Sequence, residues 1–283
     1  MRLRIAGTFF ISCRLMTIKM ITAKETVMKK CLSQLLILVL LLGLSACAKT
    51  PVLSETVPTV KPINILNATI AELDEQTMLL AGSDVSAEAE DVYMVSTSVQ
   101  VFDKEGNAAD ASILRPGMSI TLEYDGNIAE TYPMLLLGAK KISVISDEGD
   151  LIGFYRGILR ELMETDPALN EGAEVIGFDF SALDNLRESE KAALMYLASQ
   201  DAGLEYVSGT ADELTELGYI DKNRGEFING VLIELETADE KSESFTFSVS
   251  KWRSGTGAIG NDSCRAKRQN GVWSYEPGAQ WIS

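Results

Sequence analysis

The stretch Ser244-Phe245-Thr246-Phe247-Ser248-Val249 alternates polar and apolar residues without a break. Because successive side chains of a β-strand point to opposite faces, this alternation predicts a strand that buries Phe245, Phe247 and Val249 on one face. Upstream, Val231-Leu232-Ile233-Glu234-Leu235 predicts a partner strand, and the acidic residues between the two stretches form the loop of a hairpin. The chain is therefore expected to contain an antiparallel sheet in this region.

Signals on both sides of this hairpin extend the prediction to residues 151–283. Downstream, Asn270-Gly271 favours a tight turn between two further strands. Upstream, apolar residues recur at helical spacing over 151–165, and Thr210-Ala211-Asp212-Glu213 is a capping box that begins another helix. We expect an α+β domain with helices packed on a curved antiparallel sheet, of the kind found in the nuclear-transport-factor-2 (NTF2) and cystatin superfamilies.

Residues 63–146 have a different pattern. Short runs of β-branched and aromatic residues, such as 92–95 and 119–124, are separated by turn signals such as Arg115-Pro116-Gly117. Five or six strands without a strong helical period predict a small antiparallel β-barrel, with an element order like that of the OB type. The acidic residues 147–150 are expected to link this all-β domain to the α+β domain, so the overall fold class is α+β.

Two parts of the chain resemble domains of Gram-positive, clostridia-like bacteria. Tyr124-Asp125-Gly126-Asn127-Ile128-Ala129-Glu130-Thr131-Tyr132-Pro133 is similar to a pattern in small secreted domains of lipoproteins. Residues 151–283 resemble a domain that recurs in extracytoplasmic proteins, beside sensor-type membrane proteins, and that has no assigned activity. The second resemblance is carried by residues 166–170, 190–194, 213–214, 218–221 and 251–258. It implies a location outside the cytoplasm without implying a reaction.

Leu44-Ser45-Ala46-Cys47 follows the apolar run 35–42, which is itself preceded by Met28-Lys29-Lys30. This order resembles the lipobox of bacterial lipoprotein signal peptides. The apolar segment is about ten residues long, well short of the roughly 20 that a membrane-spanning helix needs. The resemblance implies that 28–46 is a signal peptide and that Cys47 carries lipid with acyl chains such as palmitate. Ordinary secretion and an uncleaved anchor are the alternatives.

The first 27 residues are basic and apolar without a clear period. One interpretation is an extended n-region of the signal peptide. The other, which we favour, is that translation begins at Met28 and the preceding residues are a mis-annotation, because Lys24-Glu25 can be encoded by a sequence that resembles a ribosome-binding site. Peptide mapping of the precursor distinguishes the two.

The charge of the chain bears on its partners. Residues 1–46 hold seven of the 25 basic and one of the 41 acidic residues, so the remainder has a formal net charge of −22. Such an acidic chain repels nucleic acid and anionic lipid head groups, so no nucleic-acid partner is expected and lipid on Cys47 must supply membrane attachment. Residues 48–62 contain three prolines and predict an extended tether that reaches roughly 45 Å.

The cysteine and histidine content of the chain excludes several kinds of catalytic and metal site. Cys13 and Cys31 precede the predicted cleavage point and Cys47 carries the lipid, so only Cys264 remains and no intrachain disulfide is expected. Cys264 is either a redox or metal thiol or, as we favour, a small buried side chain. The chain has no histidine, which excludes Ser-His-Asp and Cys-His nucleophiles and His-ligated zinc. We expect no cofactor and no metal.

The strongest candidate binding site is near the C-terminal hairpins. Cations and aromatic residues gather there in an otherwise acidic chain, and Trp252 is expected on the face opposite Phe247. The predicted ligand-binding residues are Trp252, Arg253, Arg265, Lys267 and Trp273. Such a patch fits an envelope glycan, an anionic polymer or a protein partner. The alternative is that the tryptophans are core residues and that the cations pair with nearby carboxylates such as Asp262 and Glu276.

These observations predict a lipid-anchored, extracytoplasmic lipoprotein of the cell envelope that acts as a non-catalytic binding or sensory module. Two alternatives remain. The first is an envelope hydrolase that uses carboxylates, since Asp179, Asp184, Glu188 and Glu190 are close together in sequence. The second is a structural envelope protein, which needs neither converging carboxylates nor an exposed aromatic and cationic patch.

Overall fold

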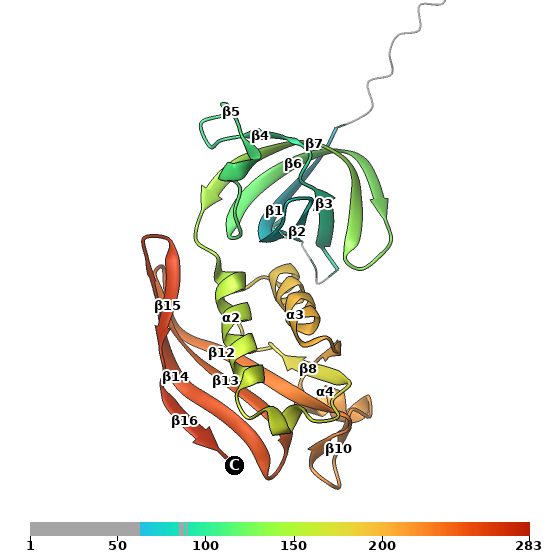
Figure 1. Cartoon of the computed structure of the whole chain (residues 1–283), viewed down its shortest axis with the longest axis vertical. Helices are drawn as coiled ribbons and strands as arrows, with labels where there is room; N and C mark the ends of the chain where they lie inside the picture. Colours follow the sequence, from blue (N-terminus) through green and yellow to red (C-terminus); the bar gives the residue numbers. More distant parts are fainter. Residues whose placement is uncertain (1–62, 85–87, 89) are drawn as a thin grey trace, which may run out of the picture. The chain divides into compact units, whose positions relative to one another are not determined.

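The computed structural model describes residues 63–84, 88 and 90–283. The predicted signal peptide, the lipid attachment at Cys47 and the tether over 48–62 lie outside the described residues. The described residues belong to one compact unit, with a barrel followed by helices packed on a second sheet (Figure 1). The predicted α+β fold class with a small barrel is confirmed.

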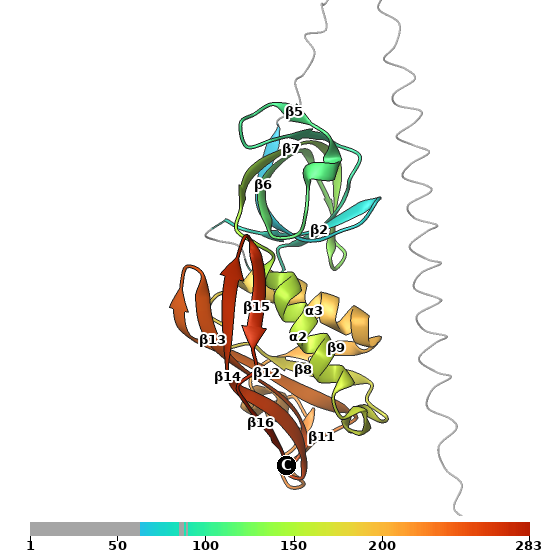
Figure 2. The same ribbon diagram turned by 60° about the vertical axis from the view of Figure 1, so that its left-hand side comes forward.

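Five strands of the first region close into a barrel. Their ring order is β1-β2-β3-β7-β6, with β6 paired to β1, and Figure 2 shows them as a ring. The strands are β1 (Asn64–Leu73), β2 (Thr77–Gly82), β3 (Val92–Ser96), β6 (Met118–Ala129) and β7 (Met134–Asp147). Three short elements connect β3 to β6 along the chain: the strands β4 (Gln100–Phe102) and β5 (Ala108–Ala109) and the 3-10 helix η1 (Ala111–Ile113). Alternate residues such as Ile120 and Leu122 fill the interior, as the polar–apolar alternation predicts.

The second region contains three α-helices, one 3-10 helix and a nine-stranded sheet. The helical elements are α2 (Leu151–Glu164), η2 (Pro167–Asn170), α3 (Glu188–Ala202) and α4 (Ala211–Glu216). The strands are β8 (Val175–Asp179), β9 (Glu205–Ser208), β10 (Ile220–Asp221), β11 (Glu226–Phe227), β12 (Gly230–Lys241), β13 (Ser244–Ser254), β14 (Gly257–Gln269), β15 (Val272–Glu276) and β16 (Ala279–Ile282). The order is β10-β11-β13-β12-β8-β9, and β14 pairs with β13 on one side and with β15 and β16 on the other.

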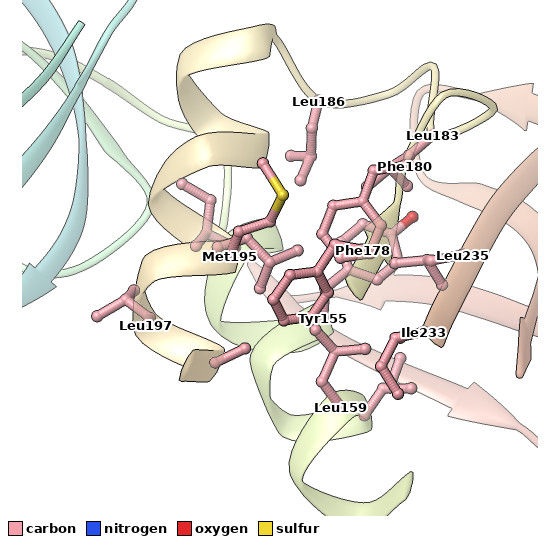
Figure 3. Close-up of a cluster of buried hydrophobic side chains, with 14 of the residues drawn as sticks. Tyr155, Leu159, Phe178, Phe180, Leu183, Leu186, Met195, Leu197, Ile233 and Leu235 are labelled. Carbon is pink, nitrogen blue, oxygen red and sulfur yellow. The ribbon is translucent and has the colours of Figure 1, made fainter. Parts of the chain in front are cut away.

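Helix α2 covers one face of this sheet because its apolar residues recur on one side. Figure 3 shows Tyr155 and Leu159 of α2 directed at Phe178, Ile233 and Leu235 of the sheet. The helix begins at the cap Asp150, whose side chain accepts a hydrogen bond of 2.7 Å from the Gly153 N–H. Since β7 ends at Asp147, only Glu148 and Gly149 separate the strand from the cap, and the predicted link 147–150 is shorter than expected.

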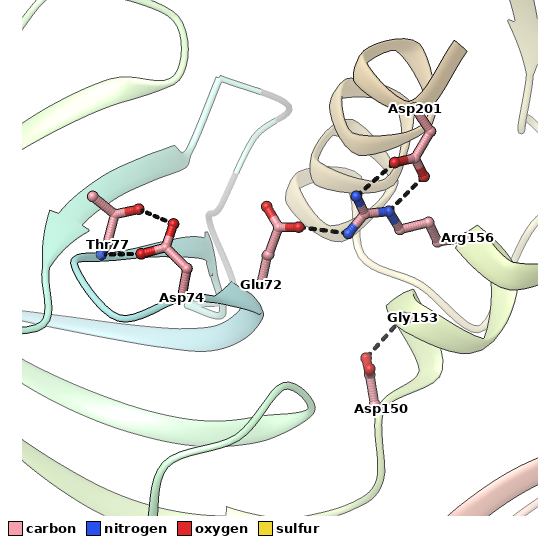
Figure 4. Close-up of polar contacts among 7 residues, drawn as sticks. All are labelled: Glu72, Asp74, Thr77, Asp150, Gly153, Arg156 and Asp201. Atoms are coloured by element: carbon pink, nitrogen blue, oxygen red, sulfur yellow. Dashed lines mark hydrogen bonds and ion pairs between the residues drawn. The ribbon is translucent and has the colours of Figure 1, made fainter. Parts of the chain in front are cut away.

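Helix α3 is buried on most sides because it contacts α2, β9 and the strands β1, β2 and β3. Its polar residues are paired: the Thr69 hydroxyl donates a hydrogen bond of 2.9 Å to Glu190 Oε1. Arg156 of α2 donates to Glu72 of β1 and, through two nitrogens, to Asp201 of α3, as Figure 4 shows. The apolar core around α3 accordingly includes Leu79 of the barrel.

Both sheets differ from the prediction in containing parallel pairs. In the barrel, β3 and β4 each run parallel to β7. In the second sheet, β8 runs parallel to β12 and to β9. The β8–β9 pair is parallel because α3 lies between the two strands and returns the chain to the same end of the sheet.

The predicted capping box at Thr210 and the turn at Asn270-Gly271 are confirmed. Within the described ranges, no helix has both the length and the apolar content to cross a membrane.

Candidate functional site

The two faces of the second sheet are unequal. On β13, Phe245, Phe247 and Val249 are buried on the face that α2 covers, as the alternation predicts. The alternate residues Thr246, Ser248 and Ser250 are partly exposed on the opposite face. We call this opposite face the open face. It is the part of the sheet that remains accessible to a ligand.

One end of the open face is covered. Trp252 lies opposite Leu232 in the β12–β13 register, and both pack with Leu214 of α4 and Phe227 of β11 in a small apolar cluster. Trp252 is therefore partly buried. Its expected position on the face opposite Phe247 is confirmed, but it belongs to a satellite core.

Next to this cluster the open face is hollowed. Two cross-strand rows form the floor, the first running through Glu234, Ser250, Gly260 and Trp281 and the second through Glu236 and Ser248. The hollow has a volume of about 360 Å³. Its lining is completed by Asp179, Ser181, Ala182, Leu235, Val249 and Asp262. Backbone and polar side chains dominate, and Trp281 is the only aromatic side chain among them.

Trp281 is held flat by its neighbours. It lies opposite Gly260 in the β14–β16 register, and a Cβ at position 260 would come within 2.3 Å of the indole carbon Cζ2. Only glycine therefore lets the indole rest on the strand. The indole N–H donates a hydrogen bond of 2.9 Å to Asp262 Oδ1, which restrains the ring from rotating in its own plane. The result is an aromatic surface whose orientation is set before any ligand arrives.

Four carboxylates line the same hollow as this indole, and Asp262 is the one bonded to it. Asp179 accepts a hydrogen bond of 2.6 Å from the Ser181 hydroxyl, and Glu234 accepts one of 3.0 Å from the Ser250 hydroxyl. In the described part of the chain, no lysine or arginine lies within 4.0 Å of Asp179, Glu234, Glu236 or Asp262, in contrast to the ion pairs found elsewhere. The hollow therefore combines an aromatic surface with a concentration of negative charge that no side-chain cation neutralises.

The five residues predicted as a site do not form one patch. Arg253 lies on the covered face, where its guanidinium donates hydrogen bonds to the carbonyls of Leu169 and Glu171. Trp273 packs against Phe154 and Phe245 on the same face, with Arg268 above its ring. Trp252 is in the satellite core described above. The remaining two, Arg265 and Lys267, are exposed on β14, and neither has an ion pair among the residues described.

Lys251 is a buried charged residue on the covered face, and its ammonium group is satisfied by hydrogen bonds. Its side chain is 0% exposed, and Nζ donates to the carbonyls of Met163, Thr165 and Asp166 and to Asn170 Oδ1 at 2.7–3.4 Å. Burial lowers the pKa of Lys251 to about 8, and the Asp166 carboxylate opposes that shift. These carbonyls belong to the end of α2 and the turn after it, so Lys251 acts as a C-terminal cap.

Cys264 is fully buried on the covered face opposite Phe247, and burial raises the pKa of its thiol. This favours the interpretation of a small core side chain over that of a reactive thiol. Among residues 63–84, 88 and 90–283, no three Asp, Glu or Cys side chains are arranged to hold a metal ion.

The sequence-based prediction of the site did not include Trp281, Glu234 or Glu236, and it considered Asp179 and Asp262 only in other roles. A signal for part of the site was present, since Glu234 and Ser250 occupy the polar positions of two alternating strands. The position of Trp281 had no such signal, because β16 pairs with residues that precede it by about twenty positions. No family model, no curated protein and no solved structure matches this chain.

Proposed function

We propose that this chain is a lipoprotein, anchored through lipid on Cys47 at the extracytoplasmic face of the cell membrane, that acts as a non-catalytic binding or sensory module. Its binding surface is the hollow on the open face of the second sheet. The observation that carries the proposal is the prearranged indole of Trp281, which shares its hollow with four carboxylates that have no lysine or arginine within 4.0 Å among the described residues.

Several features favour binding over catalysis. The hollow is broad and open, whereas a hydrolytic site needs two carboxylates directed at one bond. Asp179, Glu234 and Asp262 each accept one hydrogen bond from a neighbouring side chain, which holds each carboxylate at its own place on the surface and leaves acceptor positions for a ligand. Of the sequence-adjacent acids considered for hydrolysis, Glu190 accepts from Thr69 and from the backbone N–H of Arg187, which gives it a structural role.

The anchor is tested by labelling cells that produce the full chain with a palmitate analogue. We expect label on the wild-type protein and on a Ser45→Ala control, and none on a Cys47→Ala variant, which should leave the membrane fraction. Label that persists in Cys47→Ala would overturn the lipid attachment at this residue.

The binding role is tested by co-sedimentation of the full lipidated chain, in detergent micelles, with isolated cell-wall glycan. We expect retention of the wild type and of an Arg265→Ala control, and loss of retention for Trp281→Ala. Equal retention of all three, or no retention, would overturn the proposed binding surface. Release of soluble sugar during the assay would instead establish the hydrolase alternative.

A further inference from the structure

The chemistry of the hollow specifies its ligand more closely than the proposed function does. The face of the Trp281 indole is an apolar surface of fixed orientation, because Gly260 allows it to lie on β14 and Asp262 holds its N–H. A flat ring face complements another flat, apolar face of similar size. The C–H face of a pyranose ring is such a surface, whereas the side chains of most peptides are narrower or branched.

The rim of the hollow matches hydroxyl groups. Carboxylate oxygens accept hydrogen bonds, and each ionised carboxylate has about four acceptor positions. Asp262 and Glu234 use some of these on Trp281 and Ser250, while no side-chain donor is found for Glu236 in the described part of the chain. Ser248 Oγ accepts from the Ser263 N–H at 3.3 Å, which leaves its own hydroxyl hydrogen free to donate. The surface therefore offers mainly acceptors, which suit the O–H and N–H donors of a sugar.

The charge of the hollow adds a further requirement. Asp179, Glu234, Glu236 and Asp262 line one space of about 360 Å³, and none of them has a cation within 4.0 Å among the described residues. Their field attracts a positive group, and the negative face of the indole adds to that attraction. An anionic sugar or a phosphate polymer is repelled. A neutral sugar satisfies the hydrogen bonds but leaves the negative charge uncompensated.

We propose that the hollow binds a protonated amino sugar, with the pyranose ring stacked on Trp281 and the ammonium group among the carboxylates of Glu234, Glu236 and Asp262. This inference rests on the proposed binding role of the same surface and adds the class of ligand. It also reverses the charge of the ligand that the sequence pattern favours, because the cations of β14, Arg265 and Lys267, are not among the residues that line the hollow.

The test is isothermal titration of the full lipidated chain in micelles with three probes of graded chemistry. The probes are a glucosamine tetramer, an N-acetylglucosamine tetramer and spermine. The two tetramers share their ring and linkage but differ in charge, and spermine has charge without a ring. We expect the glucosamine tetramer to bind at least tenfold more tightly than either of the others. Its affinity should fall between 20 and 200 mM salt, because screening weakens the attraction.

Variants of the protein separate the contribution of stacking on Trp281 from that of the carboxylate charge. Trp281→Ala should weaken binding of the glucosamine tetramer by about tenfold or more, since an aromatic–cation contact and stacking are both lost. Glu234→Gln combined with Glu236→Gln should remove the preference over the N-acetylated tetramer while leaving stacking in place. Glu276→Gln is the matched control, because it removes one charge from an exposed position of β15 outside the hollow.

Each outcome decides between the two proposals. Equal binding of the two tetramers through Trp281 would overturn the amino-sugar inference while the binding role survives. Binding of spermine as tight as that of the glucosamine tetramer would show an unspecific cation site and would also overturn it. If no probe binds but cell-wall glycan still retains the wild type and not Trp281→Ala, the inference alone fails. Loss of that retention as well would overturn both.

Discussion

Strand β13 has a covered face and an open face, and neighbouring residues along the strand alternate between them. The two faces differ in burial, in polarity and in the partners of their side chains. Phe247 and Val249 meet α2 and are buried, whereas Ser248 and Ser250, their immediate neighbours, remain partly exposed. The covered face uses its side chains to hold the fold. The open face has side chains whose polar atoms and ring surfaces are still available to other molecules.

The same contrast holds for charged groups. Lys251 on the covered face has four oxygen acceptors within 3.4 Å, which come from α2, the turn after it and η2. The carboxylates of Glu234 and Glu236 on the open face have no lysine or arginine nitrogen within 4.0 Å in the described residues. A buried charge without partners destabilises a fold strongly, while an exposed one costs little and can serve binding. Unpaired charge is therefore informative about function only on the open face.

The largest expected effect tests the covered face itself. Phe247→Ala should reduce the free energy of unfolding by about 3 to 5 kcal/mol, because it leaves a cavity among Phe154, Tyr155 and Tyr275. Ser248→Ala, one position away, should change it by less than about 0.5 kcal/mol. Urea unfolding followed by circular dichroism measures both. Similar values for the two variants would contradict the division of the strand into two unequal faces.

Lys251→Met should cost about 2 kcal/mol at pH 7, since buried carbonyls lose their donor. The folded-state pKa of about 8 lies below the usual value for lysine of about 10.4, so between these pH values the unfolded chain binds the proton that the folded chain has released. The stability of the wild type relative to the variant should therefore rise from pH 8 to pH 10, by about 1.4 kcal/mol per unit at most. Urea unfolding of both proteins at pH 7, 8, 9 and 10 gives the difference in their free energies of unfolding. Groups that titrate alike in both proteins do not contribute to this difference. A difference that stays constant or falls would contradict the assigned role.

Gly260→Ala sharpens the comparison on the open face. The new Cβ would collide with Trp281, so the indole must leave the strand at a cost of about 1 to 2 kcal/mol. We expect tryptophan emission to become more readily quenched by acrylamide. Gly255→Ala is the matched control, because a Cβ there meets nothing within 4 Å. Unchanged quenching in Gly260→Ala would show that the glycine is not what holds the ring flat.

The smallest effect is expected at Arg265. Its side chain is exposed and has no ion pair in the part of the chain that the structure describes, so Arg265→Ala should change the free energy of unfolding by less than about 0.5 kcal/mol. Retention on cell-wall glycan should also be unchanged. A clear loss of retention measured by co-sedimentation would restore the cationic strand as the binding surface.

Local patterns predicted much of the fold. The alternation in 244–249, the helical spacing in 151–165 and the turn at Asn270-Gly271 each correspond to an observed element. The parallel pairs could not be predicted in this way, because the side-chain pattern of a strand is the same whichever direction its neighbour runs. The direction of β8 relative to β12 depends on the intervening helices and not on the residues of either strand.

The site was less predictable because a bulge next to the hollow changes the register of β14 relative to β13. Ser263 has a left-handed backbone, and Ser248 of β13 faces both Asp262 and Ser263 of β14 at this point. Counting alternate positions across Ser263 therefore assigns side chains to the wrong face. The sequence pattern also predicts one patch for Trp252 and Trp273, although they lie on opposite faces and the tryptophan that lines the hollow is Trp281.

Strands β12, β13 and β14 follow one another along the chain and pair as successive hairpins. Contacts between sequence neighbours close short loops and form quickly, whereas pairing β8 with β12 joins segments separated by two helices, and closing the barrel joins Tyr93 to Met134. We therefore expect the floor of the hollow to be among the first parts of the chain to fold, with barrel closure among the last.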